Sequence, residues 1–204
     1  MSQPVTVLLI RHATNPRVGK GLTGWLPGIS LDDNGRGQAE RLAARLASVP
    51  IVAIYSSPLE RAMETAQPLA RLKNLPIVPR DEFGEVHFGQ WQGLDFHEIE
   101  QDSRWRRFND LRSGTRAPGG ELMLETQARM VRGLLDVAPP HAGRTIAVFS
   151  HADAIKAALA HFLGIPLDFH LRLEISPASV SVVDLDDGLP LVRSVNASDA
   201  TGYH

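Results

Sequence analysis

The stretch Val5-Thr6-Val7-Leu8-Leu9-Ile10-Arg11-His12-Ala13-Thr14-Asn15 decides the fold class. Its apolar and β-branched run, residues 5–10, is typical of a strand buried on both faces of a sheet that helices cover. Ligands of open α/β sheets bind just beyond the carboxyl ends of the strands. Arg11 and His12 therefore stand where a ligand is expected, and both residue types bind or attack anions. Taken alone, the stretch is equally compatible with an anion site and with a strand that simply ends in two charged residues.

The composition is that of an ordinary globular protein. The chain has 204 residues, of which 43% are hydrophobic and 22% charged, and we expect one domain over residues 1–204 with a flexible tail at 196–204. The net charge of −2 gives no general reason to expect nucleic acid or an anionic membrane as a partner. Cysteine is absent, which excludes disulfides, thiolate catalysis and cysteine-bound metals. The apolar run 5–10 is too short to span a bilayer and lacks a basic leader, so we expect a cytoplasmic protein.

Strands and helices alternate along the chain. Buried strands are predicted at residues 51–55 and 145–149 and a short strand at 75–78. Two last strands are predicted at 171–175 and 179–185. Helices are predicted between Gly35 and Pro50, from Pro58 with Ser57 as the N-cap, and over residues 94–112, 121–137 and 153–163. This order predicts an α/β fold, a three-layer α/β/α sandwich with a mixed, mostly parallel central sheet.

Charged residues follow three of the buried strands. Arg11 and His12 follow the first, Arg61 lies one turn into the helix after the second, and His151 follows the fourth at a helix start. A guanidinium group binds phosphate oxygens in a fork, and a helix N-terminus favours an anion. Because these groups are expected at one edge of the sheet, they predict a pocket for a tetrahedral dianion.

Phosphoryl transfer would give these residues distinct roles. Donors around the transferred group stabilise its spread charge, and a nucleophile attacks in line. With no cysteine and no metal motif, the neutral imidazole of His12 is the strongest candidate nucleophile. The leaving alkoxide needs a proton from a carboxylic acid with a raised pKa, for which Glu85 and Glu82 are the candidates.

Five segments together resemble the histidine phosphatase superfamily, the phosphoglycerate mutase-like family. They are residues 9–15, 56–66, 85–93, 118–121 and 148–151, in the family's order and over nearly the whole chain. The resemblance implies a phosphoglycerate mutase-like fold, a transiently phosphorylated His12, and a phosphoryl group bound by Arg11, Arg61 and His151. It matches Asn15 to a phosphate-holding position, and we include Ala152 beside His151 in that set. It also selects Glu85, four residues before Gly89, as the general acid in preference to Glu82.

The chain departs from the family pattern at four positions that do not carry a catalytic atom. Ala13 and Ala152 stand where glycine is usual, Gln92 replaces a frequent glutamate, and Leu122 stands where serine is common. Each change could reshape the substrate side of the pocket.

The resemblance implies a metal-independent phosphomonoester hydrolase that acts without a cofactor on a small phosphorylated metabolite. The first alternative is a phosphoglycerate mutase. Such mutases are usually longer in the segment that corresponds to residues 94–120, which is compact in this chain. The second alternative is a non-catalytic phosphate binder. Arginines 104, 106, 107, 112 and 116, interleaved with Trp105 and Phe108, invite a nucleic-acid interpretation, but a solvated helix face explains them better. Two further possibilities stay open: one of these arginines lines the substrate entrance, and the protein assembles as a homodimer.

Overall fold

The computed structural model describes residues 3–186 and 189–198, which contain a six-stranded sheet in the order β3-β2-β4-β1-β5-β6. Three neighbouring pairs are parallel: β3 (Ile77–Pro79) with β2 (Ile51–Ser56), β2 with β4 (Thr145–Ser150), and β4 with β1 (Val5–Arg11). The last two strands, β5 (Val180–Leu185) and β6 (Leu191–Ala197), join antiparallel. The predicted mixed, mostly parallel sheet is confirmed.

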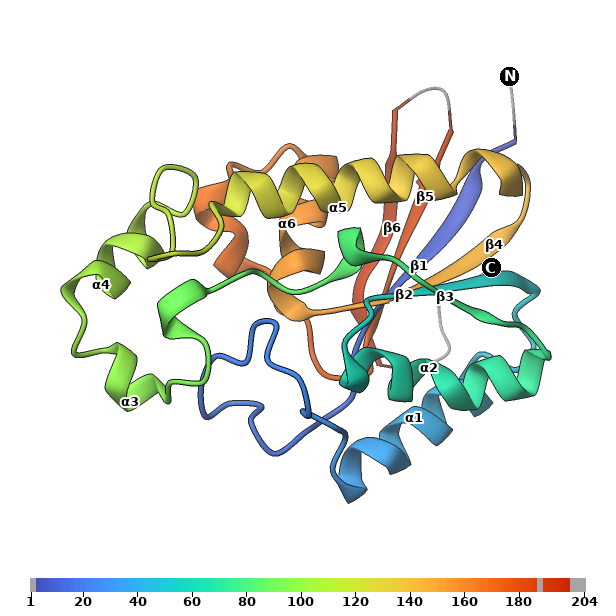
Figure 1. Ribbon diagram of the computed structural model, residues 1–204. Coiled ribbons are helices and arrows are strands. Elements are labelled where there is room, and N and C mark those ends of the chain that lie inside the picture. Colours follow the sequence, from blue (N-terminus) through green and yellow to red (C-terminus); the bar gives the residue numbers. More distant parts are fainter. Residues whose placement is uncertain (1–2, 187–188, 199–204) are drawn as a thin grey trace.

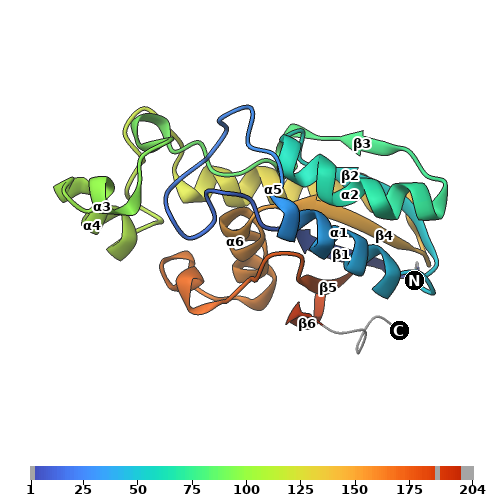
Figure 2. The same ribbon diagram turned by 90° about the horizontal axis from the view of Figure 1, so that it is seen from below.

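Helices cover both faces of the sheet, which makes the predicted three layers (Figures 1 and 2). Successive side chains of a strand point to opposite faces. Leu8 and Ile10 of β1 accordingly pack under α1 (Asp33–Arg45) and α2 (Glu60–Lys73). Val7 and Leu9 pack on the other face, under α5 (Met123–Val137) and α6 (Ala152–Leu163). All four side chains are at most 1% exposed, as the apolar run predicts.

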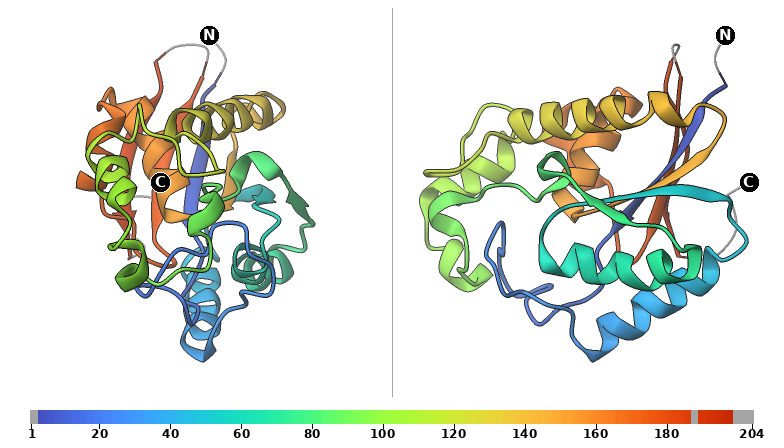
Figure 3. Two further views of the ribbon diagram at one scale, coloured as in Figure 1. Left: turned by 60° about the vertical axis from the view of Figure 1, so that its left-hand side comes forward. Right: turned by 45° about the vertical axis from the view of Figure 1, so that its right-hand side comes forward.

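A lobe built from residues 94–122 extends beyond the sheet (Figure 3). The single helix predicted over residues 94–112 is wrong, because the chain forms two short helices, α3 (Phe96–Ile99) and α4 (Ser103–Asp110). Asp102 separates them: its Oδ1 accepts from the backbone N–H of Arg104 and caps α4, while its Oδ2 accepts from Trp91 Nε1 at 2.9 Å. An apolar cluster around Phe88, Trp91 and Phe108 joins the lobe to the segment before it and to α6.

Four short 3₁₀ segments complete the described secondary structure. They are η1 (Asp81–Phe83), η2 (Gly89–Trp91), η3 (Pro139–His141) and η4 (Leu167–Arg172). None of the helices within the described residues is long and apolar enough to cross a membrane.

Two predictions for the C-terminal part are wrong. Residues 171–175 form no strand, since η4 occupies their first two positions and Leu171 is 46% exposed. The sixth strand is β6, so residues 196 and 197 of the predicted tail belong to the sheet. β6 is an edge strand that carries polar side chains, and therefore it shows little apolar alternation. The rest of the predicted tail, from residue 199, lies outside the described residues.

Candidate active site

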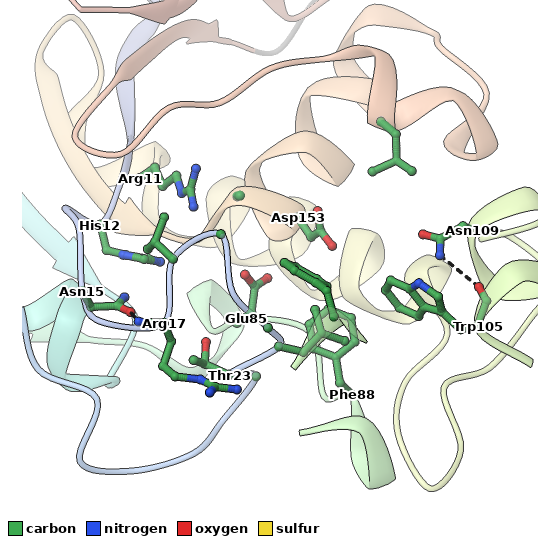
Figure 4. Close-up of a pocket in the computed structure, with 18 of the residues that line it drawn as sticks. Arg11, His12, Asn15, Arg17, Thr23, Glu85, Phe88, Trp105, Asn109 and Asp153 are labelled. Carbon is green, nitrogen blue, oxygen red and sulfur yellow. Dashed lines mark hydrogen bonds between the residues drawn. The ribbon is translucent and has the colours of Figure 1, made fainter. Parts of the chain in front are cut away.

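The carboxyl ends of β1, β4 and β2 lie side by side. In the sheet register Arg11 is opposite Ser150, and Ser56 is opposite Phe149. A pocket of about 310 Å³ opens at this edge, between the loop that follows β1, the start of α6 and the lobe (Figure 4). The predicted residues that line it are Arg11, His12, Asn15, Glu85 and Ala152, while Arg61 and His151 are fully buried beside them.

His12 is held as a neutral imidazole. Its Nδ1 lies 2.7 Å from the carbonyl oxygen of Ala13, and because a carbonyl only accepts, Nδ1 carries the proton. Nε2 therefore keeps its lone pair. Burial lowers the pKa of His12 well below its usual value, and the charges of Arg61 and Arg11 lower it further. At neutral pH this side chain is therefore an uncharged imidazole, the form that the predicted nucleophile requires.

Arg11 and Arg61 bring two buried positive charges to the same place. Arg11 Nη1 donates to the carbonyl of Ile175 at 2.6 Å, and Arg61 Nη2 donates to the carbonyl of Gly24 at 2.8 Å. The Nε atoms of both arginines, and Nη1 of Arg61, are buried with no hydrogen-bond partner among the described residues. Burial lowers the pKa of both guanidinium groups, yet arginine stays protonated in proteins. Buried charges with unused donors are costly unless an anion accepts from them, so the arrangement suits an oxyanion.

Thr65 fixes Arg61 against the loop after β1. The Thr65 hydroxyl donates to the carbonyl of Arg61 at 2.6 Å and accepts from the backbone N–H of Ala13 at 2.9 Å. The spacing of four residues places both side chains on one face of α2. One hydroxyl group thus joins the loop after β1 to the second arginine.

His151 follows β4 directly and is the N-cap residue of α6. Its ring centroid lies 5.1 Å from that of His12, and its Nε2 lies 2.8 Å from the hydroxyl oxygen of Ser57. Burial lowers the pKa of His151 well below its usual value, helped by the charge of Arg61. The prediction that Ser57 caps a helix starting at Pro58 is wrong, because α2 begins at Glu60 and the Ser57 side chain lies against His151.

Asn15 and Ala152 complete the predicted phosphate side. Asn15 is 4% exposed, and its Oδ1 accepts from the backbone N–H of Arg17 at 2.9 Å, which fixes the side-chain amide at the pocket wall. Ala152 is the first residue of α6, and the N–H groups of a first helical turn have no partner within the helix. Both positions can therefore donate hydrogen bonds into the pocket.

Glu85 is the carboxyl group that faces His12 across the pocket in Figure 4. Burial raises its pKa to about 7, assisted by the negative charge of Asp153 and opposed by the Val86 N–H, Arg61 and Arg11. It can thus hold a proton near neutral pH and also release it. Glu82, the rejected alternative, pairs with Arg80 at 3.0 Å, has a lowered pKa and does not line the pocket.

Arg129 of α5 holds the backbone that carries Glu85. It donates to the carbonyls of Glu82, Gly84 and Glu85 at 2.9, 2.8 and 2.7 Å, and pairs with Glu121 at 2.9 Å. Trp25 Nε1 donates to the same Glu85 carbonyl from the loop after β1. The general-acid candidate therefore sits on a segment that is anchored from two sides.

The glycines of the predicted motifs let this segment approach the 118–121 loop. Gly89 has φ of +55°, and a Cβ there would lie 2.2 Å from the carbonyl oxygen of Pro118. At Gly120 a Cβ would lie 2.0 Å from the carbonyl oxygen of His87. The Glu121 carboxylate then accepts from the His87 N–H at 2.9 Å, so the two motifs pack as one unit.

Asp153 is a pocket residue that the sequence analysis missed. Arg112 is one of the arginines whose role it left open. Arg112 is 3% exposed, lines the pocket and pairs with Asp153 at 3.1 Å, whereas Arg104, Arg106 and the remaining two arginines of that segment are exposed. Arg112 is thus the arginine of the basic segment that lines the entrance. The partners are 41 residues apart, so no local pattern could have paired them, although an acidic residue two positions after His151 was a visible signal.

No group of three or more His, Cys, Asp or Glu side chains within the described residues is placed to hold a metal ion.

The family model for the histidine phosphatase superfamily (branch 1) matches residues 7–198. The chain belongs to this superfamily. It is 28% identical to phosphoserine phosphatase 1 of Hydrogenobacter thermophilus, over 94% of this chain and 92% of that protein. It is 30% identical to a 2,3-bisphosphoglycerate-dependent phosphoglycerate mutase of Thermoplasma acidophilum, over 89% and 88% of the two chains. The solved structure of Bacillus stearothermophilus YhfR covers 96% of this chain and 98% of its own at 28% identity, with a TM-score of 0.90.

The predicted family and its fold are therefore confirmed, and this histidine phosphatase is an enzyme of phosphomonoester chemistry. Both a phosphatase and a mutase are among its relatives, as the two alternatives anticipated.

Proposed function

We propose that this histidine phosphatase hydrolyses the phosphomonoester of a small metabolite through a phosphohistidine on His12. One observation carries the proposal: an imidazole with a free Nε2 lone pair lies beside two buried arginines that have unused N–H donors. A phosphoryl group has the negative oxygens that these donors require and the electrophilic phosphorus that the imidazole can attack.

In the first half of the reaction, His12 Nε2 attacks phosphorus in line with the ester oxygen. The N–P bond forms as the P–O bond to the alcohol breaks, and the proton of Glu85 goes to the leaving alkoxide. Glu85 fits this step because burial and Asp153 keep its pKa about 7, where the acid form is populated.

In the second half, the Glu85 carboxylate takes a proton from water, and the water oxygen attacks the phosphorus of phosphohistidine. The N–P bond breaks, inorganic phosphate leaves, and both His12 and protonated Glu85 are restored. Throughout, Arg11, Arg61 and His151 hold the equatorial oxygens together with Asn15 and the N–H of Ala152, where donors placed in advance stabilise the transition state.

A phosphoglycerate mutase would use the same groups and return the phosphoryl to a second hydroxyl. We call residues 82–93, which carry Glu85, the acid loop. We favour hydrolysis because the segment between the acid loop and the 118–121 loop is short and forms only α3 and α4. Three expectations stay predictions: the cytoplasmic location, assembly as a homodimer, and the lack of a nucleic-acid partner.

The test is phosphate release from a panel of phosphorylated metabolites, run beside an assay for interconversion of 3- and 2-phosphoglycerate. We expect phosphate release that falls by about 10⁴-fold or more in His12→Ala. Fast interconversion without release would assign the mutase activity. Tight binding of phosphate with no turnover of any ester would make the chain a phosphate binder.

A further inference from the structure

Beyond the phosphate-binding groups, the pocket has an outer part to which the polar residues Arg17, Asn109 and Arg112 belong. Its apolar lining residues are Val18, Leu22, Phe88, Phe96, Trp105 and Leu171. They come from the loop after β1, the acid loop, the lobe and η4, so four separate segments converge on one apolar surface. In Figure 4, Phe88 and Trp105 lie on the side of Glu85 and Asp153 away from Arg11 and His12, where the alcohol of a bound ester would extend.

The arginines of the outer part are already engaged. Arg17 Nη1 pairs with Asp95 at 2.6 Å, and its Nη2 donates to the carbonyl of Gly93 at 2.9 Å. The Asp95 carboxylate offsets the charge of this guanidinium group, so a carboxylate or a second phosphate on the substrate would compete with an existing ionic partner.

Arg112 is more firmly held. It donates to Asp153 at 3.1 Å and to Asn109 Oδ1 at 2.6 Å, and its guanidinium lies over the Phe108 ring at 4.4 Å. Its partner Asp153 stays ionised, because Arg112, His170 and Lys156 outweigh the burial that would raise its pKa. A second anion on the substrate would meet this carboxylate in place of a free cation.

We propose that the outer pocket selects phosphomonoesters of alcohols that carry an uncharged, apolar group, and disfavours alcohols that carry a second anion. This inference rests on the proposed hydrolysis at His12. The volume of about 310 Å³ is at the lower end for ligand pockets, which fits a phosphate plus a single ring or a short hydrocarbon chain. Phosphoserine and phosphoglycerate, which occur in the names of two relatives, both carry a carboxylate, so the preference of this chain differs from theirs.

The decisive comparison uses three primary alkyl esters with similar leaving groups: ethyl phosphate, 2-phenylethyl phosphate and 3-phosphoglycerate. Burial of a phenyl group against the aromatic wall should raise kcat/KM about ten- to hundredfold for 2-phenylethyl phosphate over ethyl phosphate, mainly through KM. We expect 3-phosphoglycerate to fall below ethyl phosphate because its carboxylate finds Asp153 and paired arginines.

Three variants locate the effect. Trp105→Ala should bring the ratio of 2-phenylethyl to ethyl phosphate towards one, whereas Phe169→Ala, an exposed aromatic that does not line the pocket, should leave that ratio unchanged. Asp95→Asn keeps an N-cap for α3 and frees Arg17, so it should raise kcat/KM for 3-phosphoglycerate about threefold or more, as expected for one exposed ion pair.

The outcomes separate the two proposals. If none of the three esters releases phosphate, the proposed hydrolysis itself is wrong. If all three are hydrolysed and 3-phosphoglycerate equals or exceeds 2-phenylethyl phosphate in the unmodified enzyme, hydrolysis stands and the apolar selection is overturned. An unchanged ratio in a folded Trp105→Ala variant would also overturn it.

Discussion

The protonation state of Glu85 depends on its neighbours. Burial and Asp153 raise its pKa to about 7, although two arginines oppose them. A general acid acts only while protonated, and its protonated fraction falls as the pH rises through this pKa. We therefore expect kcat/KM for alkyl phosphates to decline above about pH 7, as measured by a pH–rate profile. A profile that stays flat to pH 9 would contradict the assignment.

Replacing Glu85 by glutamine removes the proton and keeps the shape. General acid catalysis typically contributes about 10²–10⁴-fold, so Glu85→Gln should lower kcat/KM for an alkyl phosphate by that factor. p-Nitrophenyl phosphate has a leaving group that needs no proton, and its hydrolysis should fall much less. The kcat/KM values of the two esters check this, because kcat/KM does not include the second half-reaction, in which Glu85 acts as a base. An equal loss on both would indicate a role other than protonation of the leaving group.

Asp153 acts on the reaction through Glu85. Asp153→Asn removes a negative charge that raises the pKa of Glu85 and leaves Arg112 without its partner, and both changes favour the ionised form of Glu85. The decline of kcat/KM should therefore begin at lower pH than in the parent enzyme. Asp110→Asn, an exposed carboxylate of the lobe that does not line the pocket, is the matched control and should not move the profile.

Among the helices, α5 is coupled to the chemistry because Arg129 holds the acid loop. Arg129→Met would remove the hydrogen bonds to three carbonyls and the ion pair with Glu121, and breaking such a largely buried pair costs about 3 kcal/mol. We expect a fall in melting temperature and a lower kcat, since Glu85 is less well positioned. Arg132→Met, on the exposed face of the same helix, should change neither quantity. A normal kcat in a destabilised Arg129→Met variant would make the arginine purely structural.

The strands that carry the site were predictable because their apolar runs are followed closely by arginine or histidine. Arg11, His12 and His151 follow such runs, and parallel neighbours bring their carboxyl ends together. The edge strand β6 was missed because its pattern is polar. Ser57 was misread as a helix cap because its distant partner, His151, is invisible in local sequence. The Arg112–Asp153 pair was unpredictable for the same reason.

Across the whole molecule, phosphate binding and stability should be coupled. Any ligand that binds only the folded state stabilises it, by about 2.7 kcal/mol at a concentration one hundred times its Kd. Inorganic phosphate should therefore raise the melting temperature. In Arg61→Met the increase should be lost, because the fully buried guanidinium with its unused donors is gone. Scanning calorimetry with and without phosphate measures both, and an equal rise in the variant would remove Arg61 from the binding site.

The central claim, that His12 carries the phosphoryl group, is tested most directly by trapping the intermediate. The enzyme is mixed with a phosphomonoester, quenched with base within one turnover, and mapped by peptide mass spectrometry. We predict one phosphoryl group on the His12 peptide, stable to base and lost in acid, and none in His12→Ala. A phosphoryl group on another residue, or full turnover by His12→Ala, would contradict the mechanism.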